Sequence, residues 1–159
     1  MKTERPYRVV IADDHVMFRN GLKRILADKP ELEVVGEASD GQELIQLLSL
    51  IPVIPDMAIV DISMPNLNGI EATSMIKRSY SGLKVLILSM HREKEYVRKA
   101  LAAGADGYLL KEDTHTELFT AIDNIRNGRF YISPLISDME DSWMSGLFPV
   151  LKVAFPVVP

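Results

Sequence analysis

The sequence predicts an α/β protein built on a doubly wound, five-stranded parallel sheet. Short apolar runs alternate along the chain with segments whose apolar residues recur at helical spacing. The runs are continuous rather than alternating in polarity, which is typical of strands buried on both faces. Repeated strand–helix units favour a parallel sheet with right-handed crossovers and helices on both faces.

Each predicted strand is followed by a predicted helix. We expect strands at the apolar runs 9–12, 32–38, 57–60, 85–88 and 107–110. Three helices begin at polar residues that resemble capping boxes. The expected capping pairs are Ser39 with Gln42, Asn68 with Glu71, and Thr114 with Glu117.

Composition excludes several classes of protein. The chain has 159 residues, 47% of them hydrophobic, a net charge of −4 and no cysteine. The acidic balance disfavours a large nucleic-acid surface, and the missing cysteines exclude disulfides and thiolate sites. No apolar stretch is long enough to span a bilayer, and the polar start does not resemble a secretory signal. We therefore expect a cytoplasmic protein.

Chemically active side chains stand where four of the predicted strands end. Asp13 and Asp14 follow the first strand, Asp61 the third, Ser89 the fourth and Lys111 the fifth. Because the carboxyl ends of parallel strands meet at one edge, these residues are expected to converge. Three carboxylates in one place repel one another, and a hard cation with oxygen ligands, such as Mg²⁺, relieves that repulsion.

This set predicts phosphoryl transfer to Asp61. The Asp61 carboxylate is the expected nucleophile, Lys111 the cation facing one phosphoryl oxygen, and Ser89 a hydrogen-bond donor to another. We expect Mg²⁺ to be held by Asp14, Asp61 and a backbone carbonyl near Ser63, with Asp13 acting directly or through water.

The same residues resemble the receiver domain of two-component response regulators. The resemblance covers residues 8–128 and includes Met64-Pro65, Gly69 and Tyr108 besides the strand-end residues. It implies a flavodoxin/CheY-like sheet of order 2-1-3-4-5 and a sensor histidine kinase as phosphodonor. It also implies that Ser89 and Tyr108 switch the surface of helix four, strand five and helix five. Segments 102–108 and 127–134 resemble regulators of the LuxR/NarL type, which control transcription.

The sequence departs from that family in three places. Glu112 follows Lys111 where many receivers have a cis proline, and the connection 51–55 is slightly long, as for a surface insertion. We predict a receiver domain over 1–128 and a linker with an atypical tail over 129–159. The tail does not resemble a helix-turn-helix, so we expect no specific DNA binding by this chain alone; a homodimer is compatible with the resemblance.

Other functions remain open at this stage. A phosphatase of the haloacid-dehalogenase type needs a second Asp two residues after its nucleophile, where this chain has Ser63. A nucleotide-binding loop needs glycines after the first strand, and there are none. An unphosphorylated, receiver-like interaction module is the alternative to a switch. His15, His91 and His115 are expected at the surface rather than in a metal site.

Overall fold

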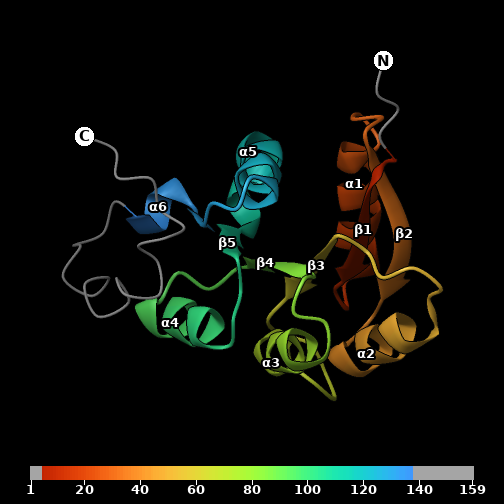
Figure 1. Ribbon diagram of the computed structural model, residues 1–159. Helices are drawn as coiled ribbons and strands as arrows, with labels where there is room; N and C mark the ends of the chain where they lie inside the picture. Colours follow the sequence, from red (N-terminus) through yellow and green to blue (C-terminus); the bar gives the residue numbers. More distant parts are fainter. Residues whose placement is uncertain (1–4, 138–159) are drawn as a thin grey trace.

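The computed structural model describes residues 5–137, which form one α/β layered structure (Figure 1). The tail beyond residue 137, on which several expectations fall, lies outside the described residues. The strands are β1 Tyr7–Ala12, β2 Leu32–Ala38, β3 Met57–Asp61, β4 Lys84–Ser89, β5 Gly107–Leu110 and β6 Tyr131–Ile132. The helices are α1 Val16–Leu26, α2 Gly41–Leu50, α3 Gly69–Ser79, α4 Lys94–Ala102, α5 Thr114–Arg126, α6 Pro134–Ser137 and the 3₁₀ turn η1 Lys111–Asp113.

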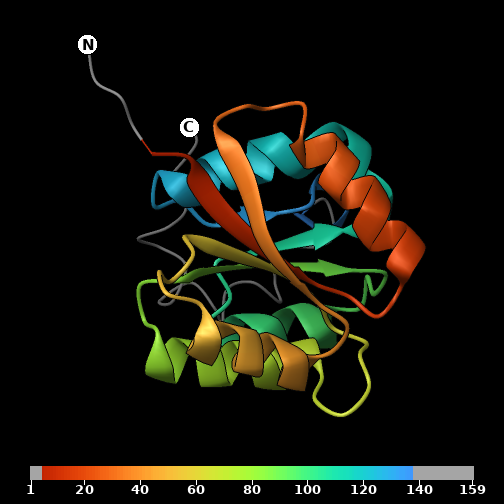
Figure 2. The same cartoon turned by 90° about the vertical axis from the view of Figure 1, so that its right-hand side faces the viewer.

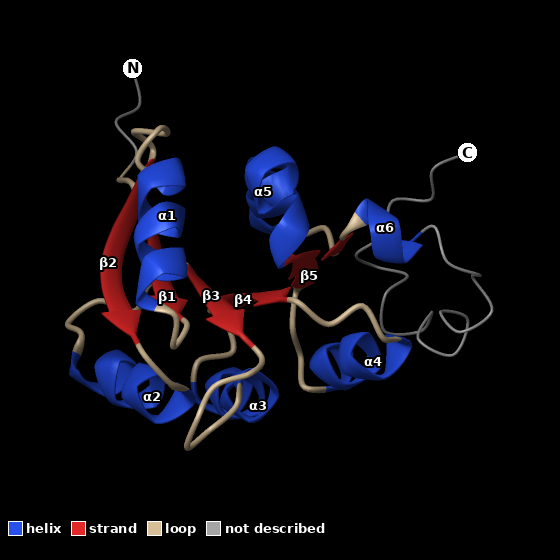
Figure 3. Ribbon diagram, turned by 180° about the vertical axis from the view of Figure 1, so that it is seen from behind, coloured by secondary structure: helices blue, strands red, loops and turns tan. Residues whose placement is uncertain are grey.

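The sheet has the order β2-β1-β3-β4-β5-β6, and every neighbouring pair is parallel. The expected fold class and the order of the first five strands are confirmed. Helices α1 and α5 cover one face, and α2, α3 and α4 cover the other (Figures 2 and 3). Strand β1 is apolar throughout because both its faces are covered. Val9 and Ile11 face the layer of α1 and α5, while Val10 and Ala12 face the layer of α2, α3 and α4.

A sixth strand, β6, extends the sheet beyond the predicted five. Tyr131 and Ile132 pair with Gly107 and Tyr108, and both side chains are buried. The Ser133 hydroxyl accepts a hydrogen bond from the Leu110 amide and fastens this extension to β5. The strand is too short to give a periodic signal in the sequence.

Two of the three expected helix caps are wrong. Asp40 rather than Ser39 caps α2, by accepting from the Glu43 amide, while Ser39 binds the Glu43 carboxylate instead. Thr114 donates its hydroxyl to the Lys111 carbonyl, so it closes η1 and does not cap α5.

The third cap and the expected surface connection agree with the structure. Asn68 caps α3, accepting from the Ile70 and Glu71 amides, as predicted. Val53 and Ile54, in the connection before β3, are exposed. Among the described residues, no helix is both long and apolar enough to cross a membrane.

Candidate functional site

The carboxyl edge of the sheet brings together the predicted strand-end residues. Asp13 follows β1, Asp61 is the last residue of β3, Ser89 is the last residue of β4, and Lys111 follows β5. Asp13, Asp61 and Ser89 are almost completely buried. The parallel topology thus places residues from distant parts of the chain at one end of one sheet.

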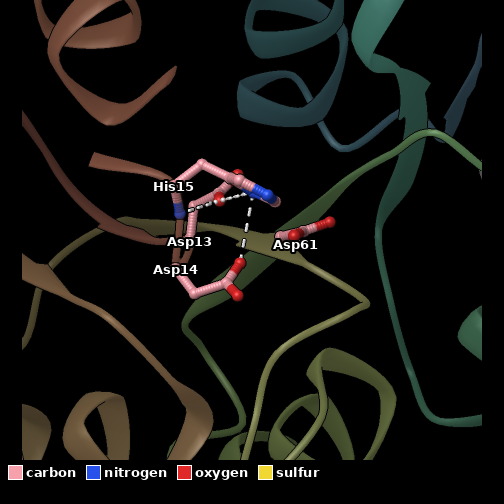
Figure 4. Close-up of side chains that lie close together, drawn as sticks. All are labelled: Asp13, Asp14, His15 and Asp61. Carbon is pink, nitrogen blue, oxygen red and sulfur yellow. Dashed lines mark hydrogen bonds and ion pairs between the residues drawn. The ribbon is translucent and has the colours of Figure 1, made fainter. Parts of the chain in front are cut away.

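Four side chains form what we call the acidic cluster: Asp13, Asp14, His15 and Asp61 (Figure 4). One ligand atom from each lies within 4.8 Å of the other three. The His15 Nδ1 atom lies 3.1 Å from an Asp13 oxygen and 3.2 Å from an Asp14 oxygen. Asp13 also accepts from the His15 amide, so the loop after β1 folds around that carboxylate.

Lys111 supplies the positive charge beside the two buried carboxylates. Its Nζ atom lies 2.7 Å from Asp13 Oδ2 and 3.4 Å from Asp61 Oδ2. The ammonium also lies 4.4 Å from the centre of the Phe18 ring, within the range of a cation–π interaction. Lys111 therefore reaches inward, and its position is set from three sides.

The environment of Asp61 disfavours its charged form. Burial raises the pKa of the Asp61 carboxyl, and the neighbouring Asp13 charge raises it further. The Lys111 ammonium and a hydrogen bond from the Ser63 amide lower the pKa, but they do not outweigh burial. A cation bound among these carboxylates would favour the charged carboxylate.

The loop after Asp61 turns tightly because Gly69 lacks a side chain. The Gly69 amide donates to the Ile62 carbonyl, and an added Cβ at Gly69 would lie 2.1 Å from the Asp61 carbonyl oxygen. No other residue type fits so close to that backbone. Asn66 takes a positive φ of 67° in the same loop and binds the Asp40 carboxylate.

Three residues from β4, β5 and the loop after β4 form what we call the hydroxyl cluster: Ser89, Tyr108 and His91. The Ser89 hydroxyl accepts a hydrogen bond from the His91 amide, and the Tyr108 hydroxyl donates to the His91 carbonyl over 2.7 Å. Burial raises the pKa of Tyr108 to about 12, and a hydrogen bond with Ser89 lowers it in part. Tyr108 therefore remains a neutral donor at physiological pH.

Sequence reasoning missed two histidines that lie at the site. His15 has an exposed side chain, as expected, yet it belongs to the acidic cluster. The signal was its position directly after Asp13-Asp14. The His91 imidazole lies 2.9 Å from the Ser63 hydroxyl and stacks on Tyr96 with ring centres 3.9 Å apart. No sequence pattern predicts that contact, since it joins two loops.

The donor atoms of the acidic cluster fit a hard divalent cation. Three of the four groups are carboxylates, and oxygen is the ligand atom that Mg²⁺ and Ca²⁺ prefer. Asp14 and His15 lie toward solvent, so a cation there would retain water molecules. The metal role expected for the Ser63 carbonyl stays a prediction, as do the catalytic and switching roles of the other residues.

Comparison with known families matches residues 9–123 to the response regulator receiver domain. The chain belongs to this family. The transcriptional regulatory protein DegU of Brevibacillus brevis is 42% identical over 134 residues, which are 84% of this chain and 56% of that protein. The chain thus spans little more than half the length of this receiver-containing relative.

Solved receiver structures share the fold. A LuxR-family two-component response regulator from Aurantimonas sp. SI85-9A1 is 36% identical, with a TM-score of 0.78, over 83% of this chain and 93% of that one. The isolated REC domain of RcsB from Salmonella enterica serovar Typhimurium, solved with the phosphomimetic BeF₃⁻, is 28% identical, with a TM-score of 0.77, over 84% and 97%. The expected kinship with LuxR-type regulators is confirmed.

Proposed function

We propose that this receiver domain accepts a phosphoryl group on Asp61 in a reaction that requires Mg²⁺. The observation that carries the proposal is the geometry around Asp61. A buried carboxylate at a strand end lies beside further carboxylates that fit a cation, and Lys111 lies beside it as well. Receiver domains of the family work as signalling modules, and we assign this chain to that role rather than to turnover of a separate substrate.

The chemistry follows from the groups present. One Asp61 carboxylate oxygen forms a bond to phosphorus, while the bond from phosphorus to the donor breaks and the leaving group keeps its electron pair. The Lys111 ammonium faces one phosphoryl oxygen, and the Ser89 hydroxyl donates to another. Asp13, Asp14, Asp61 and the Ser63 carbonyl would hold the cation. Mg²⁺, when bound, would neutralise charge on the phosphoryl oxygens.

The same proposal names partners and a switch. A sensor histidine kinase is the proposed phosphodonor, as the family relationship supports. Phosphorylation would change the contacts of Ser89 and Tyr108 and thereby the surface of α4, β5 and α5. We further propose that this receiver domain derives from regulators of transcription. A homodimer is compatible with that relationship, and we expect no specific DNA binding by this chain alone.

The test is intact mass before and after incubation with Mg²⁺ and acetyl phosphate. We expect one added phosphoryl group in the wild type and none in Asp61→Asn, because the amide is a poor nucleophile of nearly the same shape. Asp123→Asn, the same change at an exposed position of α5, is the matched control and should be labelled normally.

Other outcomes would point elsewhere. Labelling of Asp61→Asn at the wild-type rate would move the acceptor to another residue. An unlabelled wild type with Mg²⁺ bound would favour the unphosphorylated interaction module. Saturable, sequence-dependent retention of a DNA fragment would contradict the expectation on DNA.

A further inference from the structure

An ion pair between Arg92 and Glu112 joins two loops that carry site residues. Arg92 lies in the loop after β4, three positions beyond Ser89, and Glu112 directly follows Lys111. The Arg92 Nε atom lies 3.0 Å from Glu112 Oε1, and Arg92 Nη2 lies 2.5 Å and 2.6 Å from the two carboxylate oxygens. Both oxygens of the carboxylate are therefore engaged.

The side chains of Lys111 and Glu112 leave the same turn in different environments. Lys111 is 10% exposed and reaches the acidic cluster, whereas Glu112 is 49% exposed and meets Arg92, which is 51% exposed. The Thr114 hydroxyl donates to the Lys111 carbonyl and closes this turn. Because η1 is a single short turn closed by that hydrogen bond, a displacement of Glu112 also displaces the backbone of Lys111.

Among the described residues, the other contacts of the loop after β4 reach α4, the end of β4, β5 and the loop after β3. The Glu93 carbonyl accepts from the Tyr96 and Val97 amides of α4. The His91 amide donates to Ser89, its carbonyl accepts from Tyr108, and its imidazole meets Ser63. None of these contacts reaches η1. Arg92 thus adds the link from the Ser89 loop to the Lys111 loop.

We propose that Arg92 and Glu112 are positioning residues that hold the Ser89 hydroxyl and the Lys111 ammonium in register for phosphoryl transfer. The inference rests on the proposed function of Asp61. A half-exposed ion pair contributes only modestly to stability. Phosphoryl transfer, by contrast, depends strongly on the placement of the groups around phosphorus. The pair acts on the rate of phosphorylation rather than on the fold.

The first test is the initial rate of labelling by acetyl phosphate at saturating Mg²⁺. We expect Glu112→Gln and Arg92→Gln each to slow labelling about 3- to 10-fold. The charge-exchanged double variant, Arg92→Glu with Glu112→Arg, should recover to within about twofold of the wild type. Glu95→Gln and Arg98→Gln make the same changes at exposed positions of α4 and should label like the wild type.

Mg²⁺ affinity separates positioning from a general defect. Neither Arg92 nor Glu112 contacts the acidic cluster, so Mg²⁺ titration by calorimetry should give dissociation constants within about twofold for all variants. A parallel loss of Mg²⁺ affinity and rate would overturn the proposal. So would equal rates in the wild type and Glu112→Gln, or a double variant slower than either single one.

Hydrogen exchange tests the link without phosphorylation. Within residues 90–93, the His91 amide, which donates to Ser89, should exchange about 3- to 10-fold faster in Glu112→Gln than in the wild type, and the amides of β1 should not change. Unchanged exchange of the His91 amide would overturn the link between the loops. If the wild type were never labelled by phosphodonors, the proposed function would fail, and this experiment would still decide whether the pair holds the loop.

Discussion

The acidic cluster and the hydroxyl cluster lie at the same edge of the sheet, yet they are stabilised in different ways. In the first, Asp13 and Asp61 are buried charges that depend on Lys111 nearby. In the second, Ser89 and Tyr108 are neutral and bind backbone atoms of His91. Removing one partner of a buried ion pair lowers the free energy of unfolding strongly, whereas a neutral hydrogen bond can be replaced by another at small cost in free energy. One half of the site is therefore suited to binding charge and the other to rearrangement.

The largest expected effect comes from removing the counter-charge of the acidic cluster. Lys111→Met leaves two buried carboxylates without their ammonium partner, and we expect a loss of about 3 kcal/mol in the free energy of unfolding without Mg²⁺. Because Mg²⁺ can replace the lost charge, it should stabilise this variant more than it stabilises the wild type. Urea unfolding with and without Mg²⁺ measures both effects.

The control for this prediction is the same substitution on the surface. Lys99→Met, at an exposed position of α4, should change the free energy of unfolding by less than about 0.5 kcal/mol. Equal losses in the two variants would mean that the acidic cluster does not depend on Lys111. The contrast between the two halves of the site would then fail.

The second effect is a pH dependence specific to the acidic cluster. Burial and Asp13 raise the pKa of Asp61 in the folded state, so folding favours its protonated form. The stability that this protonated form contributes is complete below the ordinary Asp pKa of about 3.9 and is lost as pH rises through the raised value. Asp61→Asn, always neutral, should therefore melt at a higher temperature than the wild type at pH 7 without Mg²⁺.

That difference should shrink as the pH falls to the ordinary Asp pKa of about 3.9 and below, because the wild type then increasingly carries a protonated, neutral Asp61. Melting curves at several pH values test this, with Asp123→Asn as the exposed control. A difference that does not change with pH would show that the amide acts through packing and not through charge. A less stable Asp61→Asn at neutral pH would contradict the effect of burial on Asp61.

The acidic cluster was more predictable from the sequence than the hydroxyl cluster. A carboxylate or lysine after an apolar run is placed by topology alone, so Asp13, Asp61 and Lys111 converge once the sheet is parallel. The positions of His15 and His91 depend on how two loops fold, and no periodicity encodes that. Ser89 ends β4 and Tyr108 lies within β5, so the predicted sheet fixes where both residues lie. It does not predict that both bind His91.

The errors in the fold have similar local causes. Ser39 and Asp40 are both good capping residues, and only the true start of α2 decides between them. Thr114 is the first residue of α5 rather than its cap, and its hydroxyl donates to the Lys111 carbonyl of η1 instead of accepting from the helix. Strand β6 is held by side-chain and backbone contacts to β5, in particular through Ser133, and these contacts do not show in a pattern of polarity.

The smallest expected effect concerns the hydroxyl cluster. Tyr108→Phe removes the donor to the His91 carbonyl and keeps the ring, so we expect a loss of about 1 kcal/mol in the free energy of unfolding. Tyr80→Phe, on a partly exposed ring at the end of α3, is the control and should lose less. Because the pKa of Tyr108 is about 12, its hydroxyl stays protonated at every pH from 5 to 9.

The loss in Tyr108→Phe should thus be the same across that pH range, unlike the difference for Asp61→Asn. Urea unfolding at pH 5, 7 and 9 measures it. A loss that varied with pH would indicate that Tyr108 is coupled to the charge on Asp61, so that the two clusters titrate together. A constant loss would leave the hydroxyl cluster as the neutral half of the site, free to change its contacts with Ser89 and His91 while the charged half retains its own.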